Sequence, residues 1–161
     1  MKAMTIAISE CLVGENCKYN GGNNYRKRVL EYIKGCEVIP ICPEVMGGLP
    51  IPREPSEIVD GIVKHRDGTS VDKEFHRGAA AAYEAIIDKN VDCVILQPRS
   101  PSCGVHSIYD GTFSGRIIPG EGVFARLLRE KGIRTVDVED FENTIKEERT
   151  RHAENSKTAQ R

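Results

Sequence analysis

Six cysteines are the side chains in this chain of 161 residues that most clearly offer chemistry. Thiolates are nucleophiles and soft metal ligands, and thiols pair as disulfides only where the surroundings are oxidising. The cysteine fraction is well below the roughly 8–10 % that marks a small disulfide scaffold. The N-terminal residues do not form a secretory leader of the usual pattern, so we expect a cytoplasmic protein with reduced thiols.

The overall composition describes the kind of protein that carries these thiols. Lys and Arg total 23 against 24 Asp and Glu, a net charge of −1, and 39 % of the residues are hydrophobic. A net charge this small provides no excess of positive charge that would attract phosphate backbones or anionic lipid. We therefore expect no nucleic-acid partner and no membrane partner. The length predicts a single domain over residues 1–145 and a polar tail over 146–161, frayed or disordered. Nothing in the pattern indicates an oligomeric state.

Short apolar runs alternate with helical patterns along the chain. Helices are predicted near residues 25–33, after an N-cap at Asp72, and around Phe124. The alternation predicts an α/β fold, a Rossmann-like three-layer sandwich with a mainly parallel sheet of about four to five strands. The predicted strands cover residues 5–9, 36–42, 92–96 and 134–138, with a small hairpin inside 58–71.

The cysteines divide into two groups on this framework. Cys11, Cys42 and Cys103 each follow the end of a predicted strand. Because the carboxyl ends of parallel strands meet at one edge of a sheet, where ligands bind, we expect these thiols to converge. Cys36 and Cys93 stand at or near the beginnings of strands among apolar neighbours, and we expect them to be small buried hydrophobic residues.

Three converging thiols in a reducing compartment suit either zinc or an iron–sulfur cluster. Neither Cys-x-x-Cys nor the ferredoxin spacing occurs, so the spacing does not choose between the two. Three protein ligands leave one coordination position open, which is what catalysis needs. Cys17 lies in the same loop as Cys11 and is either a fourth ligand or, the interpretation we favour, a spare loop thiol.

Oxygen-bearing side chains accompany these thiols in the sequence. Glu44 follows Cys42 in Cys-Pro-Glu and is placed to act as a general acid or base, although a solvated loop carboxylate has the same appearance. Ser100 and Ser102 flank a proline just before Cys103. Their hydroxyls could donate hydrogen bonds to a substrate or to cluster sulfur, but serines are also common in turns without any function.

A set of short motifs occurs in the order typical of one family. The motifs are Ser9-Glu-Cys-Leu-Val-Gly14, Cys17-Lys-Tyr-Asn-Gly21, Cys42-Pro-Glu44, Gly47-Gly-Leu49 with Pro52-Arg53, Gly78-Ala79, Ser100-Pro-Ser-Cys-Gly104, Ile108-Tyr-Asp-Gly-Thr-Phe-Ser-Gly115 and Gly120-Glu-Gly-Val123. Through them, residues 5–138 resemble the thiouracil desulfurases, a family long described as a bacterial domain of unknown function. One departure is Glu10, where alanine is commoner in the family.

The resemblance implies a [4Fe–4S] cluster held by the cysteines that match Cys11, Cys42 and Cys103, with one iron left free for the sulfur of the substrate. The implied enzyme is a desulfurase. A small thiolated pyrimidine base such as a thiouracil loses sulfur and gains oxygen from water without a redox change. Glu44 and Ser100 match the proposed catalytic pair. The soft thione sulfur suits an open iron better than it suits a hard cation.

Two other interpretations use the same residues. The cysteines could hold zinc or carry sulfur in a non-catalytic module, or the chain could bind a small molecule without any metal. Metal content separates the three: about four irons for a [4Fe–4S] cluster, one zinc for a zinc module, and neither for the third.

Overall fold

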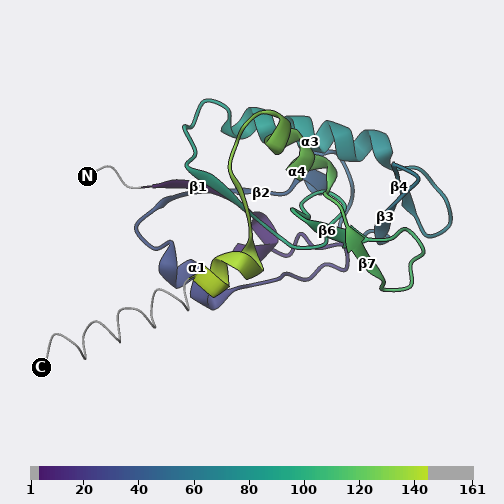
Figure 1. Ribbon diagram of the computed structural model, residues 1–161, viewed down its shortest axis with the longest axis horizontal. Coiled ribbons are helices and arrows are strands. Elements are labelled where there is room, and N and C mark those ends of the chain that lie inside the picture. The colour runs from purple at the N-terminus through teal and green to yellow at the C-terminus, as the bar shows by residue number, and fades with distance from the viewer. Residues whose placement is uncertain (1–3, 145–161) are drawn as a thin grey trace, which may run out of the picture.

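The computed structural model describes residues 4–144, and its centre is a four-stranded parallel sheet in the order β2-β1-β5-β8. The strands are β1 (Thr5–Ser9), β2 (Glu37–Ile41), β5 (Cys93–Leu96) and β8 (Thr135–Asp137). They match the four strands expected from the sequence, so the mainly parallel α/β sheet is confirmed (Figure 1). The expected domain boundary and polar tail lie outside the described residues.

Helices cover both faces of this sheet because alternate strand residues point in opposite directions. Ala7, Val94 and Leu96 pack with α3 (Asp72–Ile86) and α4 (Val123–Glu130). Ile6, Ile8, Cys93 and Ile95 pack on the other face with α1 (Lys27–Tyr32) and with residues 138–144, which are helical. In Figure 1, α3 runs along the top and α1 lies below the sheet. None of the helices in the described residues is long and apolar enough to span a bilayer.

Helix α3 confirms the predicted apolar face but not the predicted cap. The face residues Phe75, Ala79, Ala82 and Ile86 are all buried. Asp72, expected as the N-cap, is instead the first helical residue, and Val71 occupies the cap position. The Asp72 carboxylate accepts a hydrogen bond from the Val63 N–H at 3.0 Å. The side chain therefore joins α3 to the neighbouring strand rather than closing the helix end.

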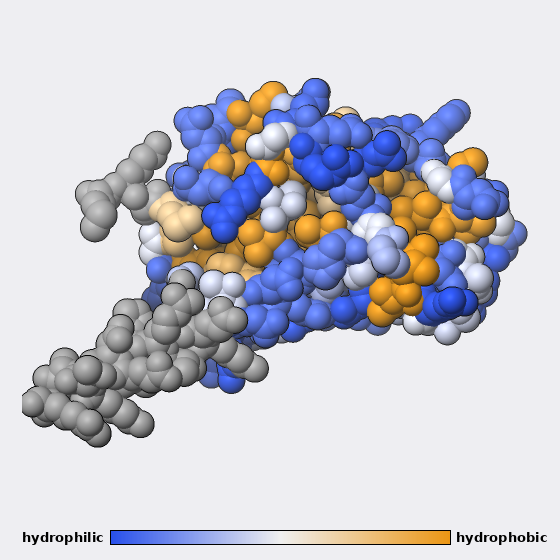
Figure 2. Space-filling view, viewed as in Figure 1, coloured by the Kyte–Doolittle hydropathy of each residue, from blue (hydrophilic) through white to orange (hydrophobic). Residues whose placement is uncertain are grey.

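Two antiparallel hairpins complete the fold. The first, β3 (Ser56–Val59) with β4 (Ile62–His65), turns at Asp60-Gly61 as expected. The second, β6 (Ser107–Tyr109) with β7 (Ile117–Pro119), lies outside the strands predicted from the sequence. Its strands have three residues each, too short for a periodic pattern, and β7 is exposed. Figure 2 shows apolar surface in the region of β7.

Candidate functional site

The carboxyl ends of β1, β2 and β5 bring three of the cysteines to one cavity. The register pairs Ser9 with Ile41 and Ile8 with Ile95, so these strand ends lie level. Cys11 follows β1 in a short 3₁₀ turn (Glu10–Val13), Cys42 directly precedes α2 (Pro43–Met46), and Cys103 lies in the loop after β5. All three line a cavity of about 610 Å³. Parallel pairing of the strands thus brings together side chains that are far apart in the sequence.

Cys17, which we expected to be either a fourth ligand or, more simply, a spare loop thiol, lies in the same cavity. Its side chain is buried and hydrogen-bonds with both Cys11 and Cys42. These two hydrogen bonds, followed by burial, raise the pKa of Cys17 above its ordinary value. Cys17 is therefore a fourth thiol at the site, in direct contact with two of the expected ligands.

The three expected ligands differ in how readily they ionise. The hydrogen bond with Cys17 lowers the pKa of Cys11 to about 7 against the opposing effect of burial, with a further contribution from Asn24. The Asn24 Nδ2 lies 3.4 Å from the Cys11 Sγ. The same kind of contact with Cys17 lowers the pKa of Cys42. Burial raises the pKa of Cys103 to about 12. Ionising Cys103 therefore needs a nearby positive charge, which a bound metal supplies.

The spacing of the thiols can be compared with the geometry of a single zinc ion. Two thiolates on one tetrahedral zinc, each with a bond of about 2.3 Å, lie only about 3.8 Å apart. Among the described residues, the one group of three ligand atoms lying within 4.8 Å of one another is His106, Asp137 and Asp140, and none of these lines the cavity. No three sulfur atoms of the described cavity cysteines therefore lie that close together. The all-sulfur donor set is typical of soft metal centres such as iron–sulfur clusters.

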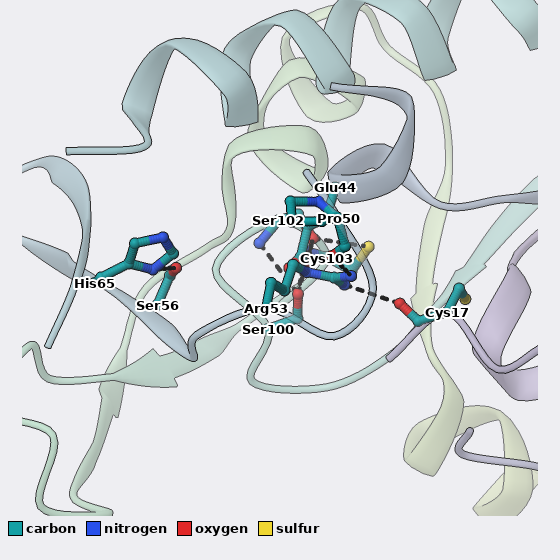
Figure 3. Close-up of polar contacts among 9 residues, drawn as sticks. All are labelled: Cys17, Glu44, Pro50, Arg53, Ser56, His65, Ser100, Ser102 and Cys103. Atoms are coloured by element: carbon teal, nitrogen blue, oxygen red, sulfur yellow. Dashed lines mark hydrogen bonds and ion pairs between the residues drawn. The ribbon is translucent and has the colours of Figure 1, made fainter. Parts of the chain in front are cut away.

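A polar network adjoins the thiols (Figure 3). The Arg53 Nε donates to the Glu44 Oε1 at 3.1 Å, and the Ser102 hydroxyl donates to the Glu44 Oε2 at 3.0 Å. The Ser100 Oγ lies 2.9 Å from the Ser102 Oγ. The Ser102 Oγ is also 3.5 Å from the Cys103 Sγ. Glu44 and Ser100, both expected from the sequence, thus belong to one network, but Ser102 is the serine that contacts the carboxylate.

Close backbone packing holds Glu44 at this position. It lies on α2, where a side chain at Gly47 would collide with the backbone of Glu74 in α3. A side chain at Gly78 would collide with the carbonyl oxygen of Pro43. Two facing glycines therefore let the short helix lie directly against α3. This contact explains Gly47 and Gly78 within the Gly47-Gly48 and Gly78-Ala79 motifs.

The loop of Cys103 is held by the beginning of α4. The N–H groups of Val123 and Phe124 donate to the carbonyls of Pro101 and Ser102, each at 2.8 Å. These bonds satisfy helix N–H groups that lack partners inside the helix, so α4 anchors the loop. A side chain at Gly122 would overlap the backbone of Ser102, which explains the glycine there.

The remaining two cysteines lie away from the cavity. Cys93 is buried at the beginning of β5, as expected, and Cys36 is half-buried beside the same apolar cluster. Sequence reasoning assigned no role to Arg53 or Asn24 and left Ser102 without a specific contact. Arg53 was visible only as part of a motif, and no spacing rule pairs it with a carboxylate nine positions earlier.

The fold and site together define an α/β protein with a thiol-lined cavity beside a held carboxylate. A model of the 2-thiouracil desulfurase family matches residues 6–140. The "Uncharacterized protein YbbK" of Bacillus subtilis (strain 168) is 34% identical over 150 residues, covering 87% of this chain and 99% of that protein. A solved structure described as the [4Fe-4S]-dependent thiouracil desulfidase TudS is 36% identical, with a TM-score of 0.77, covering 83% of this chain and 90% of that one.

The chain belongs to the 2-thiouracil desulfurase family. The resemblance stated from the motifs is confirmed, and so is the expectation of a desulfurase. The match of residues 6–140 includes the cavity cysteines, Glu44 and both serines.

Proposed function

We propose that this protein catalyses the hydrolytic, non-redox desulfuration of a small thiolated pyrimidine base of the thiouracil type. The observation that carries the proposal is the meeting of three thiols with a held carboxylate in one cavity. The thiols offer a cofactor site and the carboxylate offers a proton acceptor, which are the two requirements of the reaction. The similar solved structure, described as a [4Fe-4S]-dependent thiouracil desulfidase, supports it.

We propose Cys11, Cys42 and Cys103 as the ligands of a [4Fe–4S] cluster. When bound, the cluster supplies an iron with an open position that attracts the thione sulfur and makes the attached carbon more electrophilic. The iron of a bound cluster would supply the positive charge that ionisation of the buried Cys103 requires. Three protein ligands are enough, so we propose that Cys17 lies beside two of them without binding the cluster.

We propose Glu44 and Ser100 as the catalytic pair. Glu44 removes a proton from water as the water oxygen bonds to the base carbon, and the carbon–sulfur bond then breaks. The thiolated base and water become the oxo base and hydrogen sulfide, so both protons of the water finish on sulfur. Ser100 is placed to pass on the proton, because its hydroxyl reaches Glu44 through the Ser102 hydroxyl.

The walls of the cavity suit a flat substrate. Tyr109 and Phe113, from the second hairpin and its turn, line the cavity and offer aromatic surface on which a pyrimidine ring can stack. We propose a free small molecule in the cytoplasm as the substrate, with neither nucleic acid nor a membrane as partner. The net charge of −1 supports this part of the proposal.

The test is anaerobic reconstitution followed by a turnover assay. We expect a brown protein with about four irons and four sulfides per chain that converts 2-thiouracil or 4-thiouracil to uracil and releases sulfide. Uracil serves as the control that must release none. A colourless protein with one zinc would favour the non-catalytic module instead. A cluster-loaded protein that released no sulfide from any thiolated base would overturn the proposal.

A further inference from the structure

We propose that Arg53 and Ser102 are positioning residues that hold the Glu44 carboxylate from opposite sides. The inference rests on the proposed function, in which Glu44 receives the proton. Each residue takes a different oxygen: Arg53 Nε is 3.1 Å from Oε1, and Ser102 Oγ is 3.0 Å from Oε2. A carboxylate held at one oxygen can turn about that contact. Held at both, it has one orientation, which general-base catalysis needs.

We call the pair Arg53 and Ser102 the Glu44 clamp. The Arg53 half of this clamp is itself held in place. The Arg53 side chain is only 5% exposed, and its two terminal nitrogens donate to backbone carbonyls. Nη1 lies 3.2 Å from the Pro50 oxygen, and Nη2 lies 2.9 Å from the Cys17 oxygen. The planar guanidinium therefore makes three directed contacts at once, which the single ammonium of lysine does not reproduce. Through its contacts with the Cys17 oxygen and with Glu44, Arg53 also joins the Cys17 loop to the helix that carries Glu44.

The Ser102 side is fixed by its own turn. Ser102 is 1% exposed, and its N–H and that of Cys103 both donate to the Ser100 Oγ at 3.1 Å. The packing of Gly122 against the Ser102 backbone leaves little room for the turn to shift. The hydroxyl of Ser102 is thus aimed at Glu44 by the loop that delivers Cys103. The clamp joins the carboxylate to the thiol loops on both of its sides.

The kinetic test compares Arg53→Lys and Ser102→Ala with two matched controls. Arg129→Lys alters another arginine paired with a glutamate, Glu121, at 2.6 Å, and Ser70→Ala removes an exposed hydroxyl; neither residue lines the cavity. Because a displaced catalytic group costs about 10²-fold in rate, we expect kcat to fall about 10–100-fold in each clamp variant. KM for thiouracil and the iron content stay within about threefold of wild type. The controls keep the wild-type kcat.

Two further comparisons separate positioning from a merely structural role. Ser102→Thr keeps a hydroxyl, so we expect it to recover most of the rate lost in Ser102→Ala. In a Glu44→Gln background, neither Arg53→Lys nor Ser102→Ala should lower the remaining rate more than about twofold, because both act through the same carboxylate. Full additivity in that background would overturn the proposal.

A readout independent of turnover keeps the inference distinct from the proposed function. In the reconstituted protein, Arg53→Lys should lower the melting temperature, and the shift should be less than half as large when Glu44→Gln is already present. Equal shifts in both backgrounds would show that the two side chains are not coupled and would overturn the clamp. If the wild type converts no thiolated base, the proposed function fails, while this coupling still reports on the clamp. If the wild type is active and both clamp variants keep its kcat, the clamp alone fails.

Discussion

The cysteines at the two ends of the same parallel sheet have opposite surroundings. At the carboxyl ends of β1, β2 and β5, Cys11, Cys42 and Cys103 line a polar cavity. At the amino ends of β2 and β5, Cys36 and Cys93 lie against an apolar cluster. β2 and β5 thus each have one cysteine before or at their first residue and another after their last.

The difference lies in what surrounds the sulfur. At the carboxyl edge the backbone leaves the sheet in loops, so thiols meet amide, carboxylate and other thiol groups, and contacts with Cys17 lower the pKa of Cys11 and Cys42. At the amino edge, burial raises the pKa of Cys93, and the nearby Arg134 opposes this only in part. Residue type alone therefore does not separate a proposed ligand from a packing residue, whereas position relative to the strand does.

Cys103→Ala is expected to have the largest effect. Removing one of three ligands leaves the proposed cluster with only two, so we expect iron to fall from about four per chain to below about one, and desulfuration to fall at least 10³-fold. Iron analysis and the sulfide-release assay measure both. Cys93→Ala is the matched control from the other end of the same strand and should keep both. Wild-type iron content in Cys103→Ala would contradict the proposed ligand set.

Glu44→Gln should come next in size and should separate chemistry from cofactor binding. The amide keeps the shape of the carboxylate but cannot accept the proton, so we expect kcat to fall about 10²–10⁴-fold. The visible absorbance and iron content should remain those of the wild type, because Glu44 is not a proposed ligand. An undiminished kcat would remove Glu44 from the proposed mechanism.

Cys17→Ser tests the fourth thiol and should have an intermediate effect. Serine keeps a hydrogen-bond donor near Cys11 and Cys42, so we expect about four irons per chain and a loss of activity below about tenfold. Cluster absorbance and sulfide release are the measurements, with Cys36→Ser as a control outside the cavity. A loss of iron as severe as that in Cys103→Ala would make Cys17 a ligand.

Cys93→Ala should have the smallest effect, and it falls on stability. Losing the buried sulfur leaves a small cavity, which we expect to lower the free energy of unfolding by about 1 kcal/mol at pH 7. Burial raises the pKa of Cys93 above its ordinary value of 9.0. A raised pKa in the folded state means that wild-type stability is complete below about pH 9 and declines above it. The difference in free energy of unfolding between wild type and Cys93→Ala should therefore become smaller above pH 9. Urea unfolding measures it, and a difference that grew would contradict this reasoning.

Much of the framework was predictable because its signals are local. The four strands are short apolar runs, and the apolar face of α3 repeats with the helical period. The hairpin β6–β7 was missed because three-residue exposed strands carry no such pattern. Asp72 was misassigned because a carboxylate before a helix resembles a cap until the strand beside it, with the Val63 N–H, is in place.

By itself, the sequence determined which reactive groups and motifs are present. These are three cysteines after strand ends, the carboxylate of Glu44, and the motifs of the 2-thiouracil desulfurase family. Only the tertiary structure decided how these groups meet. It placed Cys17 against two of the thiols and set Glu44 between Arg53 and Ser102. The physical reason is distance along the chain. Strand and helix patterns arise from neighbouring residues, whereas a contact between Glu44 and Ser102, 58 positions apart, exists only after the sheet and helices have packed.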